Sequence, residues 1–265
     1  MSPADTAEPA KIVNRILITN DDGINAPGLA ELEAIARQLA DEVWVFAPDG
    51  NCSGYGRSLT ITRDLKVTDH GNNRYSCDGT PTDCIILALN HFMKESRPDL
   101  VLSGINLGMN VADDITCSGT VGAGWEAVVH GVPAIALSQK YDRRRMELDN
   151  PENFSASRHH AAGVIRDLWA ESWPEDVLMN VNFPSIDAAE VKGRKAISVG
   201  RHKAADDVIK GEQDGTWRIG MWRLRDSLDP ESDVGAVFDG FITLCPLRIN
   251  MTDYDHLTKI KAIAS

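Results

Sequence analysis

The chain has 265 residues, of which 43% are hydrophobic, and a formal net charge of -12 from 27 Lys and Arg against 39 Asp and Glu. This length and hydrophobic content predict a packed core rather than wholesale disorder, in one large domain or in a core with an appendage. The acidic balance argues against nucleic acid or an anionic membrane as the main partner. It leaves room for a small phosphate ester, because a bound cation can reverse the local field.

The first residues and the cysteines bear on where the protein works. Residues 1–14 are small, polar and acidic and lack the apolar core of a signal peptide, so a flexible tail is expected. No apolar stretch approaches the length of a membrane span. The five cysteines are scattered without a C-x-x-C pair, which makes a disulfide framework or a zinc knuckle improbable and favours a reducing, cytoplasmic setting.

The front half alternates apolar, β-branched runs with segments of helical periodicity. Strands are predicted at residues 12–19, 42–47, 99–103 and 134–138. Helices are predicted from Pro27 over the segment PGLAELEAIARQLA, over residues 82–93, and from about 121 to 130, where Gly131 and Pro133 follow. This alternation predicts an α/β fold whose parallel sheet is covered on both faces, with ligands bound beyond the carboxyl ends of the strands.

The back half is less regular. A helix is predicted at 154–169 and strands at 177–183, 196–200 and 241–247. Residues 201–234 are polar, with a β-like piece at 216–222, and this long arm is either a mobile loop or a β-hairpin that reaches a partner subunit. We therefore divide the chain into a tail (1–14), an α/β catalytic core (15–200), and an arm with a C-terminal segment (201–265).

The first predicted strand runs directly into Asn20-Asp21-Asp22-Gly23. Two adjacent carboxylates repel each other unless something positive lies between them, and a hard divalent cation bound by oxygen is the usual solution. The same four residues are also ordinary in a polar turn, and the Asp-Asp-Gly sequence alone favours that simpler interpretation.

Two further loops follow predicted strands. In the loop after residues 42–47, Ser53 could offer a hydroxyl to a metal and Arg57 could face a phosphate, although this segment by itself favours a plain surface loop. In the loop after residues 99–103, the side-chain carbonyl of Asn106 suits a hard cation.

That second loop leads to Ser118-Gly119-Thr120 at the start of a predicted helix, where hydroxyls and backbone N–H groups suit an anion. The alternative is a helix cap that serves stability alone. Together, the loops bring oxygen donors and a helix start to one edge of one sheet. The all-oxygen donor set favours Mg²⁺ or Mn²⁺ over Zn²⁺, and the arrangement predicts a metal-dependent phosphate-ester hydrolase.

At this point the sequence resembles the SurE stationary-phase survival proteins. The matching segments are ILITNDDGINAPGL (16–29), APDGNCSGYGRSLT (47–60), DGTPTDCIILAL (78–89), PDLVLSGINLGMNVADDITCSGTVGAGWEA (98–127) and GFITLCPLRINMTDYD (240–255). They extend from the first predicted strand nearly to the end of the chain. The loop rich in glycine and asparagine before Ser-Gly-Thr is quite specific to this family.

The resemblance implies a Rossmann-like, three-layer core with an extended C-terminal β-arm used to form homodimers or homotetramers. It implies a 5′-nucleotidase that also acts on 3′-nucleotides and short polyphosphate, with one divalent cation per subunit. The family's metal ligands fall on Asp21, Asp22, Ser53 and Asn106, of which Asp21, Asp22 and Asn106 are the expected catalytic residues. Its phosphate contacts fall on Asn110, Ser118, Gly119 and Thr120.

The chain departs from the family pattern in places that concern substrate preference. Tyr55, Gly56 and Arg57 occupy a stretch where the family commonly has smaller or different polar residues, and Trp125 replaces a smaller residue or Met. A non-catalytic nucleotide sensor on the same scaffold is the rival hypothesis, although an acidic pair without a metal would repel its ligand. A general phosphatase or exopolyphosphatase is the other enzymatic alternative.

Overall fold

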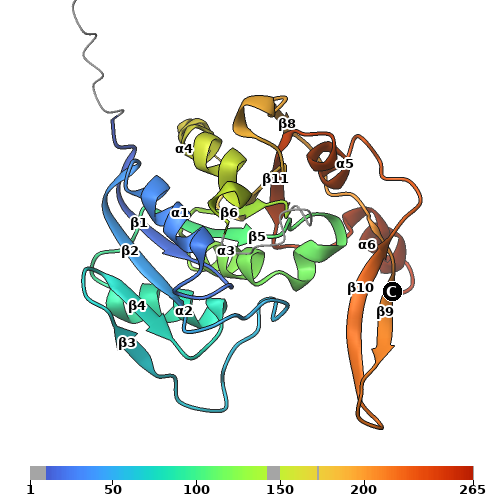
Figure 1. Cartoon of the computed structure of the whole chain (residues 1–265), viewed down its shortest axis with the longest axis horizontal. Coiled ribbons are helices and arrows are strands. Elements are labelled where there is room, and N and C mark those ends of the chain that lie inside the picture. The colour runs from blue at the N-terminus through green and yellow to red at the C-terminus, as the bar shows by residue number, and fades with distance from the viewer. Residues whose placement is uncertain (1–9, 142–149, 172, 265) are drawn as a thin grey trace, which may run out of the picture.

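The computed structural model describes residues 10–141, 150–171 and 173–264, so most of the predicted tail lies outside the described residues. A nine-stranded sheet forms the centre of the molecule (Figure 1), in the order β3-β4-β2-β1-β5-β6-β7-β11-β8. Its strands are β1 (Val13–Thr19), β2 (Ala40–Pro48), β3 (Val67–Asp69), β4 (Arg74–Cys77), β5 (Leu100–Leu107), β6 (Ala134–Gln139), β7 (Val177–Phe183), β8 (Arg194–Ala196) and β11 (Ile242–Arg248).

The central strands are parallel, and only strands towards the two ends of the sheet run against a neighbour. Strands β4, β2, β1, β5, β6 and β7 pair in parallel in that spatial order. Strand β3 is antiparallel to β4, and β11 is antiparallel to β7. The predicted α/β class with a mainly parallel sheet is therefore confirmed. The carboxyl ends of β1, β2 and β5 meet along one edge.

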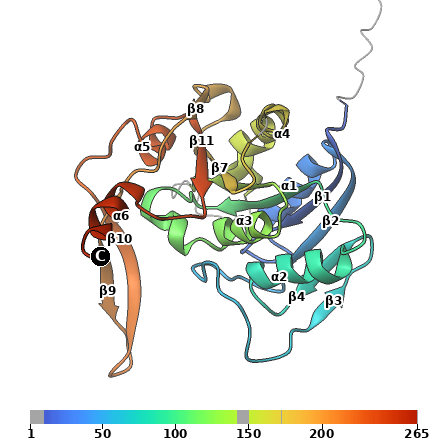
Figure 2. The ribbon, with the colours of Figure 1, turned by 180° about the vertical axis from the view of Figure 1, so that it is seen from behind.

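Helices cover both faces and form a three-layer core, as seen from behind in Figure 2. On one face α1 (Pro27–Ala36) packs against α4 (Ser155–Ala170), over an apolar cluster that includes Leu29 and Ile165. On the other face α2 (Pro81–Leu87) packs against α3 (Gly119–Val129), over a cluster that includes Ile85 and Val121. The sheet thus divides the hydrophobic interior into two cores.

Helix starts follow local chemistry. Pro27 opens α1, and Pro81 opens α2 after a capping box between Thr80 and Asp83. The hydroxyl of Ser118 accepts a hydrogen bond from the N–H of Val121, so α3 begins two residues earlier than the apolar periodicity predicts.

Three predicted elements differ in extent. The single helix expected over 82–93 is α2 followed by a π-helical turn, η1 (Ala88–Phe92), in which the N–H of Met93 bonds to the carbonyl of Ala88. Strand β5 continues four residues beyond its predicted end, to Leu107. The strand expected at 196–200 is wrong in position, because β8 ends at Ala196 and the chain leaves the sheet through a bridge between Ser198 and Ser232.

The arm is a β-hairpin, the second of the two structures that its sequence allowed. Strands β9 (Lys203–Lys210) and β10 (Trp217–Leu224) pair antiparallel in a sheet of their own and project from the core in Figure 1. Helix α5 (Asp233–Phe238) leads back to β11, and α6 (Tyr254–Lys261) follows it. The remaining short helical turns are η2 (Ala112–Cys117), η3 (Pro151–Phe154) and η4 (Ala188–Glu190). Among the described helices, none has the length and apolar character needed to cross a bilayer.

Candidate active site at the carboxyl edge of the sheet

The turn after β1 holds two carboxylates in a fixed conformation. The side chain of Asn20 closes the turn, since its amide nitrogen donates to the carbonyl of Gly23 at 2.9 Å and its oxygen accepts the N–H of Gly23 at 3.2 Å. Gly23 has φ +105, and a Cβ there would lie 3.0 Å from the backbone of Gly50. Only glycine combines a positive φ with the absence of a Cβ, so the turn that carries Asp21 and Asp22 is tight.

Asp21 is buried against the start of α3. The hydroxyl of Thr120 donates to Oδ1 of Asp21 at 2.6 Å. A Cβ added to Gly119 would lie 2.8 Å from the Cβ of Asp21. Burial raises the pKa of the Asp21 carboxyl, and the Thr120 hydroxyl with the N–H groups of Gly119 and Thr120 partly offsets that rise. The carboxylate and the helix start are therefore in direct contact.

Asp22 lies beside Asp21 and is half-buried. Burial, and secondly the charge of Asp21, raise its pKa to about 6. The N–H of Leu107 at the end of β5 lies 3.5 Å from its Oδ2, which is a long contact. Across the described ranges, no lysine or arginine stabilises either carboxylate.

Asn106 is the last residue but one of β5, on the same edge of the sheet as Asp21 and Asp22. Its amide nitrogen donates to the carbonyl of Gly108 at 2.7 Å, so its amide oxygen is the end left for a ligand. Strand β5 pairs with β1 through Thr19 and Ser103, and this pairing carries Asn106 past the end of β1. The contact of Leu107 with Asp22 brings the two loops together.

Ser53 is exposed and makes no direct contact with the other candidate residues. Its loop is attached to them one residue earlier, where the N–H of Cys52 donates to the carbonyl of Asp21 at 2.7 Å. The backbone N–H of Ser53 donates to Asn51 Oδ1 at 2.7 Å. This bond does not involve the Ser53 hydroxyl.

Asn110 belongs to a buried amide network rather than to the open edge. Its N–H donates to Asn182 Oδ1 at 2.8 Å, its side chain donates to Ser138 at 2.8 Å, and its carbonyl accepts from Asn180 and Asn182. These three partners lie in β6 and β7 and are fully buried. The sequence analysis did not single them out, although two asparagines alternating in the apolar run VLMNVNF are a usable signal.

Ser118 performs the capping role that the sequence left open for it. Its own O–H is still a donor that an anion could use, beside the backbone N–H groups of the first turn of α3, which have no carbonyl partner within the helix.

The interpretation of Arg57 as a phosphate-facing residue is not what the structure shows. Its guanidinium pairs with Glu126 on α3, with Nε 2.8 Å and Nη2 2.7 Å from Oε2. Tyr55 is exposed, whereas Trp125 is buried in the core beneath α3. Of the two cysteines that flank the site, Cys52 is buried and Cys117 is exposed.

Fold and site together define an α/β protein with a carboxylate pair and a helix start at the carboxyl edge of a parallel sheet, the usual ligand-binding position in this class. The family model described as "Survival protein SurE" matches residues 16–206. The chain therefore belongs to the SurE family.

Relatives match over nearly the whole chain. A protein of Paramagnetospirillum magneticum named 5'-nucleotidase SurE is 45% identical over 260 residues, with 96% of each chain covered. One of Erythrobacter litoralis with the same name is 41% identical over 251 residues, covering 93% of this chain and 98% of that one. The crystal structure of a SurE protein from Aquifex aeolicus superimposes with a TM-score of 0.81 at 33% identity, covering 95% of this chain and 100% of that chain.

Proposed function

We propose that the protein is a metal-dependent phosphomonoesterase that hydrolyses nucleoside 5′-monophosphates to nucleoside and phosphate. The observation that carries this proposal is the buried pair Asp21–Asp22 in contact with the start of α3. Carboxylates beside an anion-binding helix start repel a phosphate unless a cation lies between them. The relatives named 5'-nucleotidase SurE support the same substrate class.

The donor chemistry of the edge fits a hard divalent cation. Both carboxylates are desolvated without a basic partner in the described part of the chain, and Asn106 presents its amide oxygen. We propose that Asp21, Asp22, Ser53 and Asn106 hold one Mg²⁺ or Mn²⁺. When bound, the ion supplies Lewis-acid stabilisation of the phosphoryl oxygens and lowers the pKa of a bound water.

The chain's own groups orient the substrate. The Ser118 hydroxyl and the N–H groups of Gly119 and Thr120 would donate to the phosphate oxygens. The Thr120 hydroxyl holds Oδ1 of Asp21, and an oxygen of this carboxylate that the cation leaves unused would orient the attacking water or accept its proton. Asn110 supports this site from the buried amide network.

We also propose that the protein works as a homodimer or homotetramer in the cytoplasm. The β9–β10 arm exposes Val208, Trp217 and Ile219, which are 60%, 65% and 73% exposed and lie on neighbouring positions of one hairpin face. Apolar side chains grouped in this way mark a surface for association. The absence of paired cysteines supports the reducing compartment.

The test is phosphate release from a panel of 5′-monophosphates, 3′-monophosphates and short polyphosphate, each with Mg²⁺ or Mn²⁺ and each with and without chelator. Release from 5′-monophosphates that stops with chelator is the expected result. Nucleotide binding without release under any divalent metal would instead identify a non-catalytic sensor. A preference for polyphosphate would identify an exopolyphosphatase.

A further inference from the structure

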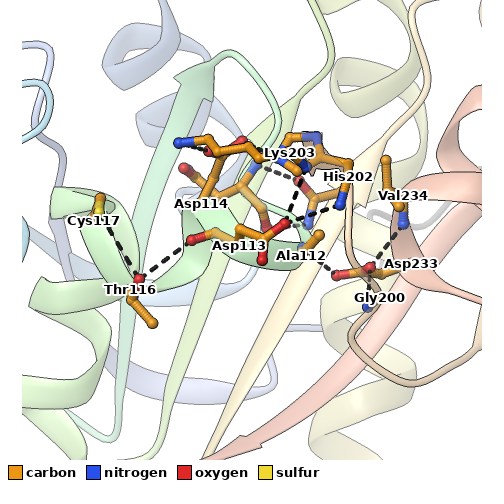
Figure 3. Close-up of polar contacts among 12 residues, drawn as sticks. Ala112, Asp113, Asp114, Thr116, Cys117, Gly200, His202, Lys203, Asp233 and Val234 are labelled. Atoms are coloured by element: carbon orange, nitrogen blue, oxygen red, sulfur yellow. Dashed lines mark hydrogen bonds and ion pairs between the residues drawn. The ribbon is translucent and has the colours of Figure 1, made fainter. Parts of the chain in front are cut away.

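Four residues join the base of the arm to the turn before α3. We call Asp113, Asp114, His202 and Lys203 the arm-base clamp (Figure 3). Oδ2 of Asp114 lies 2.9 Å from Nε2 of His202, and its Oδ1 lies 3.0 Å from Nζ of Lys203. Oδ2 of Asp113 accepts the backbone N–H groups of His202 at 2.9 Å and of Lys203 at 3.1 Å.

The arm-base clamp is more than a surface ion pair. The side chain of His202 is fully buried, and that of Asp114 is 19% exposed. Burial raises the pKa of Asp114, but the bonds from His202 and Lys203 outweigh it and leave the pKa below its ordinary value. The charged form of Asp114 is thus the form that these contacts stabilise.

A second anchor lies at the first residue of η2. Ala112 has φ +50, a left-handed conformation that is unfavourable for a residue with a side chain. Its N–H donates to Oδ2 of Asp233 at 2.9 Å, while Oδ1 of Asp233 accepts the N–H groups of Gly200 and Val234. The segment before the arm and the start of α5 therefore hold η2 in this strained form.

These anchors act directly on the phosphate-binding segment. Ser118 is both the residue that ends η2 and the residue that caps α3. A displacement of η2 is therefore passed to the cap and to the first-turn N–H groups of α3 without any flexible linker between them.

We infer that Asp114, through His202 and Lys203, positions the phosphate-binding start of α3, so that affinity for the phosphate group depends on how the base of the β9–β10 arm is seated. Asp114 is a positioning residue and touches neither substrate nor cation. This inference rests on the proposed function for the identity of the ligand, but the contacts that carry it are independent of catalysis.

The test compares Asp114→Asn with the unchanged protein in three measurements: KM and kcat for a nucleoside 5′-monophosphate, inhibition by inorganic phosphate, and affinity for Mn²⁺ by calorimetry. Loss of a charge-assisted contact of this kind is expected to raise KM and the phosphate inhibition constant together, by about tenfold. The value of kcat and the Mn²⁺ affinity are expected to stay within about twofold, since the cation ligands lie in other loops.

Lys203→Met is the second variant and serves alone if Asp114→Asn does not fold. It removes one of the contacts that seat the base of the arm on η2, so it raises KM as well. If the two residues act as one unit, the double variant resembles Asp114→Asn instead of adding both effects. Additive effects would overturn the inference.

Glu42→Gln is the matched control. Glu42 also holds several donors, Arg15, Trp44 and Asn73, but it lies near the start of β2, away from the carboxyl edge. This variant should keep both phosphate constants while losing comparable stability. Wild-type phosphate affinity in folded Asp114→Asn overturns the inference, and so does an equal fall in Mn²⁺ affinity. If the unchanged protein releases no phosphate, the proposed function fails, and calorimetric binding of inorganic phosphate still decides the inference.

Discussion

At the scale of single residues, Asp21 and Asp22 carry an electrostatic cost that the surrounding fold does not relieve. Both lie in a low-dielectric edge of the sheet, and each disfavours the charge of its neighbour. Two such carboxylates lower the stability of the free protein, and a bound cation would relieve that cost. The carboxylate pair is therefore where activity and stability oppose each other most directly.

Asp21→Asn should abolish metal-dependent turnover, by at least about a hundredfold, because the neutral amide lacks the negative charge that attracts the cation. The same change should raise the melting temperature measured in chelator at pH 7, since it removes one of two buried like charges. Phosphate release and thermal unfolding measure the two effects. Asp41→Asn, at an exposed position, should change neither. Wild-type turnover in the Asp21 variant would contradict the site assignment.

The raised pKa of Asp22 predicts a pH-dependent stability. Because the folded protein holds this proton more tightly than the unfolded chain, the group destabilises the fold as pH rises from the ordinary aspartate pKa of 3.8 towards about 6. Asp22→Asn should therefore add little stability at pH 4 and its full gain above pH 6. Urea unfolding in chelator at several pH values measures this difference. A gain that does not vary with pH would show that the charge is not its cause.

At the scale of elements, the contact between the turn after β1 and the start of α3 depends on Gly119 having no side chain. A Cβ on Gly119 would meet Asp21 at 2.8 Å, so one of the two must move. Gly119→Ala should lower Mn²⁺ affinity and turnover by about tenfold or more while the protein stays folded. Gly50→Ala is the control, because a Cβ there meets nothing within 4 Å. Normal activity of Gly119→Ala would mean that the start of α3 can move away from Asp21 without a loss of turnover.

The β9–β10 arm carries a prediction about assembly. Ile219 faces Val208 across the hairpin, and Trp217 lies two residues away on the same face. Ile219→Lys should shift the protein to a smaller species, seen by light scattering after size-exclusion chromatography, because a charge would be buried at the contact. Ile61→Lys, at a position 85% exposed and outside the arm, should leave the mass unchanged. An unaltered mass for Ile219→Lys would exclude this face from the interface.

At the scale of the whole molecule, the sequence predicted those features that local pattern determines. Buried strands such as β1 and β7 were visible because continuous apolar runs need both faces covered. Short edge strands such as β3 and the polar strand β9 were not, since their pairing partners, not their composition, make them strands.

The candidate site was predictable in position but not in its contacts. The rule for the carboxyl ends of parallel strands put Asp21, Asp22 and Asn106 on one edge. That Thr120 bonds Asp21, that Arg57 pairs with Glu126, and that Asn182 supports Asn110 depend on distances between segments far apart in the chain. No local spacing contains that information.

The position of β1 and β5 in the middle of the sheet has a consequence for how the protein loses activity. Edge elements open locally, whereas amides in central strands exchange with solvent only when the whole domain unfolds. Hydrogen exchange followed by mass spectrometry should therefore find Leu17 and Val101 among the slowest amides, and β3 and β8 among the fastest in the sheet. Because the acidic turn and Asn106 continue directly from the slow strands, fraying at the borders of the sheet should leave the proposed site assembled until the whole domain unfolds.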